Sequence, residues 1–134
     1  MLRIAIVLIL FAHGIGHSMG LLQLFKLAVI NPAWKGDSWL LAGTAAPVGA
    51  VLGFVVWTAA IIGFCAAAAI LLGWLPAAWW QPVAVGASLV SLVGLFLFPT
   101  AFPTASSVGA FVVDAAVLIA VLWAKFGPAQ LAHA

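Results

Sequence analysis

The chain has 134 residues, of which 68% are hydrophobic and 4% are charged, and its formal net charge is +2. A soluble domain carries roughly 25% charged residues, so four basic and two acidic side chains are too few to cover a soluble core. The composition therefore excludes a soluble fold. The basic residues stand singly rather than in a patch, which also excludes nucleic acid as a partner.

Four apolar segments are long enough to cross a bilayer as helices, which takes about 20 residues each. They are residues 2–25, 47–75, 81–98 and 106–125. Each segment is apolar on every face, and a spanning backbone must pair its polar groups internally. The sequence therefore predicts an all-α fold, an integral membrane four-helix bundle in up-down-up-down order. Residues 1–134 form a single transmembrane domain, with one longer loop between helices 1 and 2.

The ends of the predicted helices have local causes. Arg3 before an apolar run resembles the start of a signal peptide, but the run continues to Phe25 without a small-residue cleavage site, which favours a first transmembrane helix. The residue before a proline avoids the helical region, so Leu75-Pro76 is expected to end the second helix. Six tryptophans near the predicted ends are expected to anchor the chain at the membrane surfaces: Trp34, Trp39, Trp74, Trp79, Trp80 and Trp123.

Basic residues give the orientation of the predicted bundle. An even number of spans puts both termini on one side, with Arg3 and Lys125, while the first loop carries Lys26 and Lys35. This count is tied under the positive-inside rule. The free amino terminus and the acidic Asp37 in the first loop favour cytoplasmic termini. We expect an integral protein of the cell inner membrane with both termini in the cytoplasm.

The first predicted helix has a polar face. His13 and His17 are four residues apart and project about 40° from each other, so they share one side of the helix. Ala12, Gly16 and Gly20 form an adjoining small-xxx-small stripe, which is expected to let another helix approach closely.

Asp114 lies among apolar neighbours in the fourth predicted helix, where an unpaired carboxylate costs roughly 2.5–3.5 kcal/mol. Counted from the terminal side at the helical rise per residue, His17 and Asp114 fall at about the same depth. We therefore expect these two side chains to face each other, with His13 one turn closer to the termini. The same counting places three more side chains at this level: Trp57, Thr58 and Ser91.

Three interpretations of this layer stay open. In the first, the layer is structural: His17 pairs with Asp114, serine and threonine hydroxyls pair the remaining polar groups, and these hydrogen bonds fix the register of the helices. Alternatively, it holds a metal ion through His13, His17 and Asp114, a two-histidine, one-carboxylate set suited to iron or zinc, or a haem through a single histidine.

In the third interpretation the layer binds a quinone-like or lipid-like ligand, or relays a proton between histidine and aspartate. The side chains expected to contact such a cofactor are His13, His17, Trp57, Thr58, Ser91 and Asp114. The cofactor itself is left unknown, with a metal, a haem or a quinone as the options. Cys65 is the only cysteine, which excludes an intrachain disulfide, and it is expected to be a small packing residue.

The run from Phe11 to Gly20, FAHGIGHSMG, early in a four-span chain of this length, resembles the DoxX-like membrane proteins. His13-Gly14 matches the first-helix His-Gly of that family, and His17 takes the place of its lysine. The second helix of the family usually carries an acidic residue, which is missing in this chain; Trp57 or Thr58 stands near its place. The resemblance implies a small inner-membrane protein that is accessory to redox or quinone-linked systems.

The expected function is non-enzymatic. No nucleophile–base pair, phosphate-binding glycine loop or carboxylate dyad is visible, and almost no chain extends outside the predicted spans. We expect an accessory or assembly subunit of a larger membrane complex, surrounded by lipid and in contact with other membrane subunits or further copies of the chain. The alternative is a membrane protein that binds a metal, a haem or a lipid-like ligand in the polar layer.

Overall fold

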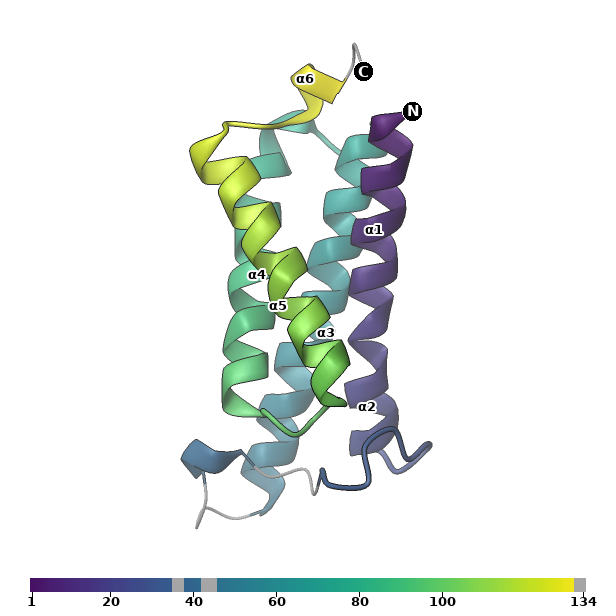
Figure 1. Cartoon of the computed structure of the whole chain (residues 1–134), viewed down its shortest axis with the longest axis vertical. Helices are drawn as coiled ribbons and strands as arrows, with labels where there is room; N and C mark the ends of the chain where they lie inside the picture. Colours follow the sequence, from purple (N-terminus) through teal and green to yellow (C-terminus); the bar gives the residue numbers. More distant parts are fainter. Residues whose placement is uncertain (35–37, 42–45, 132–134) are drawn as a thin grey trace.

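The structure is a computed structural model that describes residues 1–34, 38–41 and 46–131. All secondary structure in these ranges is helical, and the long helices form an antiparallel bundle with both termini at one end (Figure 1). The predicted all-α four-helix bundle is therefore confirmed. Lys35 and Asp37, which entered the prediction of orientation, lie outside the described residues.

The helices in chain order are α1 (Leu2–Gly16), α2 (Ser18–Leu24), α3 (Ala46–Leu72), α4 (Trp80–Leu97), α5 (Thr104–Leu118) and α6 (Pro128–Leu131). Short 3-10 turns lie at Trp39–Leu41 (η1) and Ala77–Trp79 (η2), and a π-helical turn at Ile119–Trp123 (η3) continues α5. In the described part of the chain, four stretches are long and apolar enough to cross a membrane: Leu2–Leu24, Val48–Leu72, Ala77–Leu97 and Thr104–Trp123.

The end of the second span and the continuity of the first differ most from the prediction. Helix α3 ends at Leu72, three residues before the predicted end, because Gly73 adopts a positive φ of 81°. The amide of Trp74 then bonds back to the carbonyl of Ala69, which is the pattern of a glycine-terminated helix. The first span is interrupted at His17, which separates α1 from α2 and where the amide of Gly20 bonds the His17 carbonyl in a tighter, 3-10-like step.

Helix α3 is the centre of the bundle and packs against both α1 and α4. Two glycines allow these close approaches. A Cβ at Gly14 would lie 2.9 Å from the Cβ of Phe64, and one at Gly63 would lie 2.7 Å from the Cβ of Ala87. The helix backbones at these points are therefore nearly in contact.

Helix α5 packs mainly against α4 and shares no substantial backbone interface with α1. It crosses the front of the bundle obliquely, so that it starts near α2 and its far end lies away from α1 (Figure 1). The side of the bundle between α1 and α5 is consequently less tightly closed than the other sides. We call it the α1–α5 seam.

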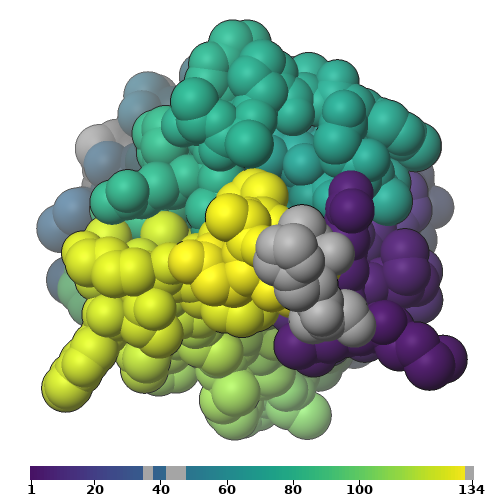
Figure 2. All heavy atoms as spheres, turned by 90° about the horizontal axis from the view of Figure 1, so that it is seen from above, coloured from purple at the N-terminus to yellow at the C-terminus, as the bar shows by residue number. Residues whose placement is uncertain are grey.

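The end of the bundle that carries the termini is covered by the C-terminal segment. Seen from that end, this segment lies across the helices, beside the N-terminus (Figure 2). The Trp80 indole N–H donates to the carbonyl of Phe126 at 2.8 Å, and Leu131 is buried below it. Trp80 and Trp34 are thus buried, and the prediction that these two anchor the membrane surface is wrong. The other four predicted anchors are exposed: Trp39, Trp74, Trp79 and Trp123.

Candidate functional site

The polar side chains of the predicted layer form one connected chain of hydrogen bonds in the bundle interior. Asp114, in α5, is fully buried, and its Oδ1 lies 2.9 Å from Nε2 of His13 in α1. The Ser91 hydroxyl of α4 donates to Oδ2 of Asp114 at 2.6 Å. The same hydroxyl oxygen lies 3.1 Å from Nε2 of His17. We call these four side chains the polar chain.

The structure corrects the predicted pairing within this layer. His13, rather than His17, contacts Asp114 directly, and His17 reaches the carboxylate only through Ser91. The two histidines are one helical turn apart, a rise of about 5.4 Å. Helix α5 begins at Thr104, two residues before the predicted start, so Asp114 lies 10 residues into it, and His13 lies 11 residues before the end of α2 at Leu24, which places the two side chains at one level.

Aromatic rings pack against both imidazoles. The His13 ring meets the Phe64 ring edge-on, with centroids 4.5 Å apart, and the His17 ring edge-on at 4.9 Å. His17 also stacks on Trp57, with centroids 5.6 Å apart and planes inclined by 10°. Since a buried ring with such contacts has few alternative rotamers, the histidines are fixed in direction as well as in position.

Trp57 is itself seated between two glycines. A Cβ at Gly20 would lie 2.9 Å from Cδ1 of the indole, and a Cβ at Gly94 would lie 2.6 Å from its Cζ3. Trp57 therefore needs glycine on both neighbouring helices in order to reach His17. The predicted role of Gly20 in a close approach is confirmed at this point.

Two predicted site residues lie outside the polar chain. Thr58 Oγ1 and the Trp57 indole nitrogen are buried without a hydrogen-bond partner among the described residues. The same holds for the hydroxyl of Ser88, one turn from Ser91 on α4. Thr58 thus shares the depth of the layer but takes no part in it, and Trp57 contributes its ring face only.

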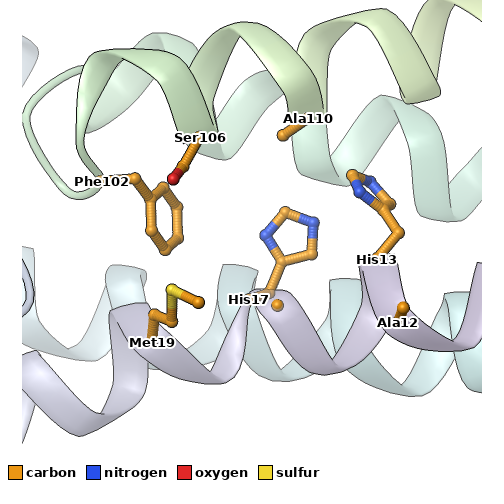
Figure 3. Close-up of a pocket in the computed structure, with 8 residues that line it drawn as sticks. Ala12, His13, His17, Met19, Phe102, Ser106 and Ala110 are labelled. Atoms are coloured by element: carbon orange, nitrogen blue, oxygen red, sulfur yellow. The ribbon is translucent and has the colours of Figure 1, made fainter.

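A pocket of about 190 Å³ lies in the seam beside the polar chain, with His13 and His17 on its wall (Figure 3). Ala12 and Met19 on one side and Ser106 on the other are exposed at its rim, so the pocket opens on the outer surface of the bundle.

This pocket corrects the interpretation of the small-residue stripe. Ala12 and Gly16 admit no helix, since Ala12 is exposed and no heavy atom lies within 4 Å of a Cβ built at Gly16. They leave an open space instead. On α5, Ser106 and Ala110 are likewise small and spaced by one turn, which is the one sequence signal that could have predicted a cavity here.

A second, apolar hollow of about 300 Å³ follows the same seam toward the terminal end. Its walls come from Ile6 and Ile9 of α1 and from Val113, Val117 and Ala120 on the other side. The His13–Asp114 contact lies between this groove and the pocket. We call the second hollow the apolar groove.

The arrangement gives no support to the predicted metal set. Within the described ranges, no group of three His, Cys, Asp or Glu side chains is placed to hold an ion. Both imidazoles use their Nε2 atoms within the polar chain, toward Asp114 and Ser91 respectively. What the residues offer chemically is a set of oriented hydrogen-bonding groups beside a cavity.

Comparisons with family models, with curated proteins and with solved structures found no match to this chain. The resemblance to DoxX-like proteins therefore stays a prediction, and the function is argued from the geometry alone.

Proposed function

We propose that this chain is an integral membrane protein that binds a lipid-soluble molecule by its polar head in the pocket between α1–α2 and α5. One observation carries the proposal: two imidazoles, fixed by a buried carboxylate and a buried serine, form part of the wall of a cavity that opens on an apolar surface. Ligand sites are typically cavities lined by apolar side chains with a few convergent polar groups.

The setting favours a ligand that arrives through the bilayer. Polar groups are costly in hydrocarbon and are normally satisfied by each other or aimed at a cavity. Here the polar chain gives both carboxylate oxygens of Asp114 and the hydroxyl of Ser91 a partner, while the imidazole edges remain beside the pocket. Two of the three exposed rim residues, Ala12 and Met19, are apolar and the third, Ser106, carries a hydroxyl, so the entrance suits a lipophilic molecule with a polar head.

Photolabelling tests this function. The protein in phospholipid nanodiscs is exposed in parallel to two diazirine-bearing probes, hexadecanol and a long-chain quinone, each with the diazirine next to the polar head. At least one probe is expected to label 16–19 and 102–110 saturably. Ala110→Phe, which fills the pocket, should remove most of this label, whereas Gly109→Phe, at a position with open space around it, should not. Even labelling of all exposed apolar positions, unchanged in both variants, would rule out the site.

A second candidate function is that of an accessory or assembly subunit of a larger, redox- or quinone-linked membrane complex. The outer face of α5 favours it, because only 11% of the fourth span is buried within the chain, against 44% of the second. Exposed along this face are two small residues one turn apart, Ala105 and Gly109, of the kind that let a transmembrane helix of another subunit approach closely.

Disulfide trapping tests the second candidate. In a background with Cys65→Ala, a cysteine at Gly109 is oxidised in native membranes and compared with one at Ile62, which is exposed on α3. A defined heterologous adduct from position 109 but not from position 62 supports a subunit role. A monomer at both positions contradicts it.

Reporter fusions at the two termini test the orientation. Both candidate functions assume an inner-membrane protein with both termini in the cytoplasm, so both fusions are expected to report a cytoplasmic location.

A further inference from the structure

The polar chain fixes which nitrogen of His17 carries a proton. A serine hydroxyl has one proton to donate and two lone pairs that accept. Ser91 donates that proton to Oδ2 of Asp114 at 2.6 Å. In its contact with Nε2 of His17, at 3.1 Å, the serine oxygen therefore accepts, and the proton of this hydrogen bond belongs to the imidazole.

The remaining nitrogen of His17 is consequently a hydrogen-bond acceptor. In a neutral imidazole one nitrogen donates and the other accepts, so a proton on Nε2 leaves a bare lone pair on Nδ1. Among the described residues, none donates a hydrogen bond to this atom. In Figure 3 the second ring nitrogen is turned toward the side of the pocket where Phe102 and Ser106 lie. The pocket therefore presents an acceptor that a ligand with a donor can satisfy.

A hydroxyl group fits this position better than a carbonyl. A carbonyl or ether oxygen has no proton to give to Nδ1 and would leave it unpaired. A hydroxyl donates to Nδ1 and keeps its own lone pairs for a donor such as the hydroxyl of Ser106, which lines the opposite side of the pocket.

The apolar groove gives the direction of the rest of the ligand. The seam-facing residues of α1 continue from Gly16 through His13 and Ile9 to Ile6 at helical spacing, and those of α5 continue from Ala110 through Val113 to Val117 and Ala120. Pocket and groove thus follow the same two helix stripes. A hydrocarbon chain that follows these stripes from the pocket to the groove would pass on the outer side of the His13–Asp114 contact.

We infer that the seam binds a single-chain lipid alcohol, with its hydroxyl on Nδ1 of His17 and its hydrocarbon chain in the apolar groove. This inference rests on the proposed function and names the class of ligand for it. The bilayer solvates a hydrocarbon chain about as well as the groove does, so the head group supplies the selectivity and the groove supplies the orientation. Aliphatic alcohols and long-chain hydroquinones share this chemistry, whereas quinones lack the donor.

Competition experiments test the head group. The head-group probes are competed with four compounds: hexadecanol, hexadecyl methyl ether, a long-chain hydroquinone and its quinone. The apparent affinity of each compound is corrected for its partition into protein-free nanodiscs. Loss of one neutral hydrogen bond predicts a roughly tenfold weaker affinity for the ether than for the alcohol. The two hydroxyl compounds, ranked against each other, distinguish an aliphatic from an aromatic alcohol. An ether or quinone that binds as tightly as its hydroxyl counterpart overturns the inference.

A matched pair of serine variants tests the proton assignment itself. In Ser91→Ala, Nε2 of His17 loses its acceptor, the proton is free to occupy Nδ1, and the preference for alcohol over ether should fall to about twofold or less. In Ser88→Ala, whose hydroxyl has no partner in the described structure, the wild-type preference should remain. The wild-type preference is measured independently of both variants, so a poorly folded Ser91→Ala protein leaves the first test intact. An unchanged preference in a folded Ser91→Ala protein overturns the assignment.

A probe with the diazirine at mid-chain tests the position of the chain. It should label 6–10 and 113–121, and Ala116→Phe, in the groove, should remove this label without changing the label from the head-group probe. Ile119→Phe, exposed and outside both hollows, is the control. If the head-group probe labels the pocket but the mid-chain probe labels the whole lipid-facing surface, the inferred position of the chain is wrong. The proposed function would still stand. No saturable label from any probe overturns the proposed function.

Discussion

The imidazole of His13 and the carboxylate of Asp114, 101 positions apart in the chain, meet at 2.9 Å across a side of the bundle where the helix backbones share little contact. This contact joins the first span to the last. The two residues lie along their helices between the pocket, which His13 lines, and the apolar groove, which neither of them lines.

Asp114→Ala should destabilise the protein, because it removes the acceptor of two hydrogen bonds, one from His13 and one from the hydroxyl proton of Ser91. Interhelical bonds of this kind contribute roughly 0.6–1.7 kcal/mol each, so we expect a loss of about 1–3 kcal/mol. Reversible unfolding in mixed detergent micelles measures it. Asp114→Asn keeps the shape and an acceptor oxygen and should lose less. Wild-type stability in the alanine variant would show that the contact does not hold the seam.

The two buried serines of α4 should respond in opposite ways to the same substitution. Ser91→Ala removes the bridge between His17 and Asp114 and should cost about 1–2 kcal/mol. Ser88→Ala removes a buried hydroxyl that has no partner among the described residues, and should be neutral or stabilising by up to about 1 kcal/mol. The same unfolding assay compares them. Equal losses in both variants would mean that burial, and not the hydrogen bonds, determines the cost.

Two glycines of α1, two residues apart, should also differ. A methyl group at Gly14 would meet Cβ of Phe64 at 2.9 Å and the Ile61 carbonyl at 3.3 Å, so Gly14→Ala should force α1 and α3 apart at a cost of about 1–3 kcal/mol. Gly16→Ala meets no heavy atom within 4 Å and should stabilise the helix by about 0.5–1 kcal/mol. Thermal unfolding of the two single variants gives the comparison, and the reverse order would contradict the placement of α1 against α3.

The purified protein should contain less than one metal ion per chain and show no haem absorption. The physical reason is that Nε2 of His13 and Nε2 of His17 are both engaged within the polar chain, and the described residues hold no three-ligand group. Elemental analysis and an absorption spectrum of the wild type measure this, with His17→Ala as the comparison. One metal per chain that is lost in His17→Ala would restore the metal interpretation.

The polar layer was predictable because helical rise alone relates sequence position to depth. Four antiparallel spans of similar length bring His13, His17, Ser91 and Asp114 within about a turn of one level, whatever the details of packing. The pairing inside the layer was not predictable in the same way. His13 and His17 differ by one turn, which is within the uncertainty of predicted helix ends, and the observed start of α5 at Thr104, two residues before the predicted start, decides between them.

Other differences between sequence and structure come from local chemistry and from tertiary packing. Gly73, directly before Trp74, ends α3 three residues before the end that Pro76 predicts, because a glycine takes the left-handed conformation of a helix terminus readily. Thr58 and Ser91 fall at one depth, and only the rotation of each helix about its axis decides which hydroxyl faces Asp114. The apolar groove lies where α5 diverges from α1, a course that no residue of either helix specifies by itself.

The order in which the chain is synthesised gives the seam a further consequence. Asp114 belongs to the last span, whereas His13, His17 and Ser91 belong to earlier ones. Until α5 packs onto the bundle, two imidazoles and a serine hydroxyl lie in an unfinished interior with no carboxylate to meet them. Packing of α5 against the earlier helices is therefore the step that completes the polar chain, and we expect a chain stopped before Thr104 to leave these polar groups without their carboxylate.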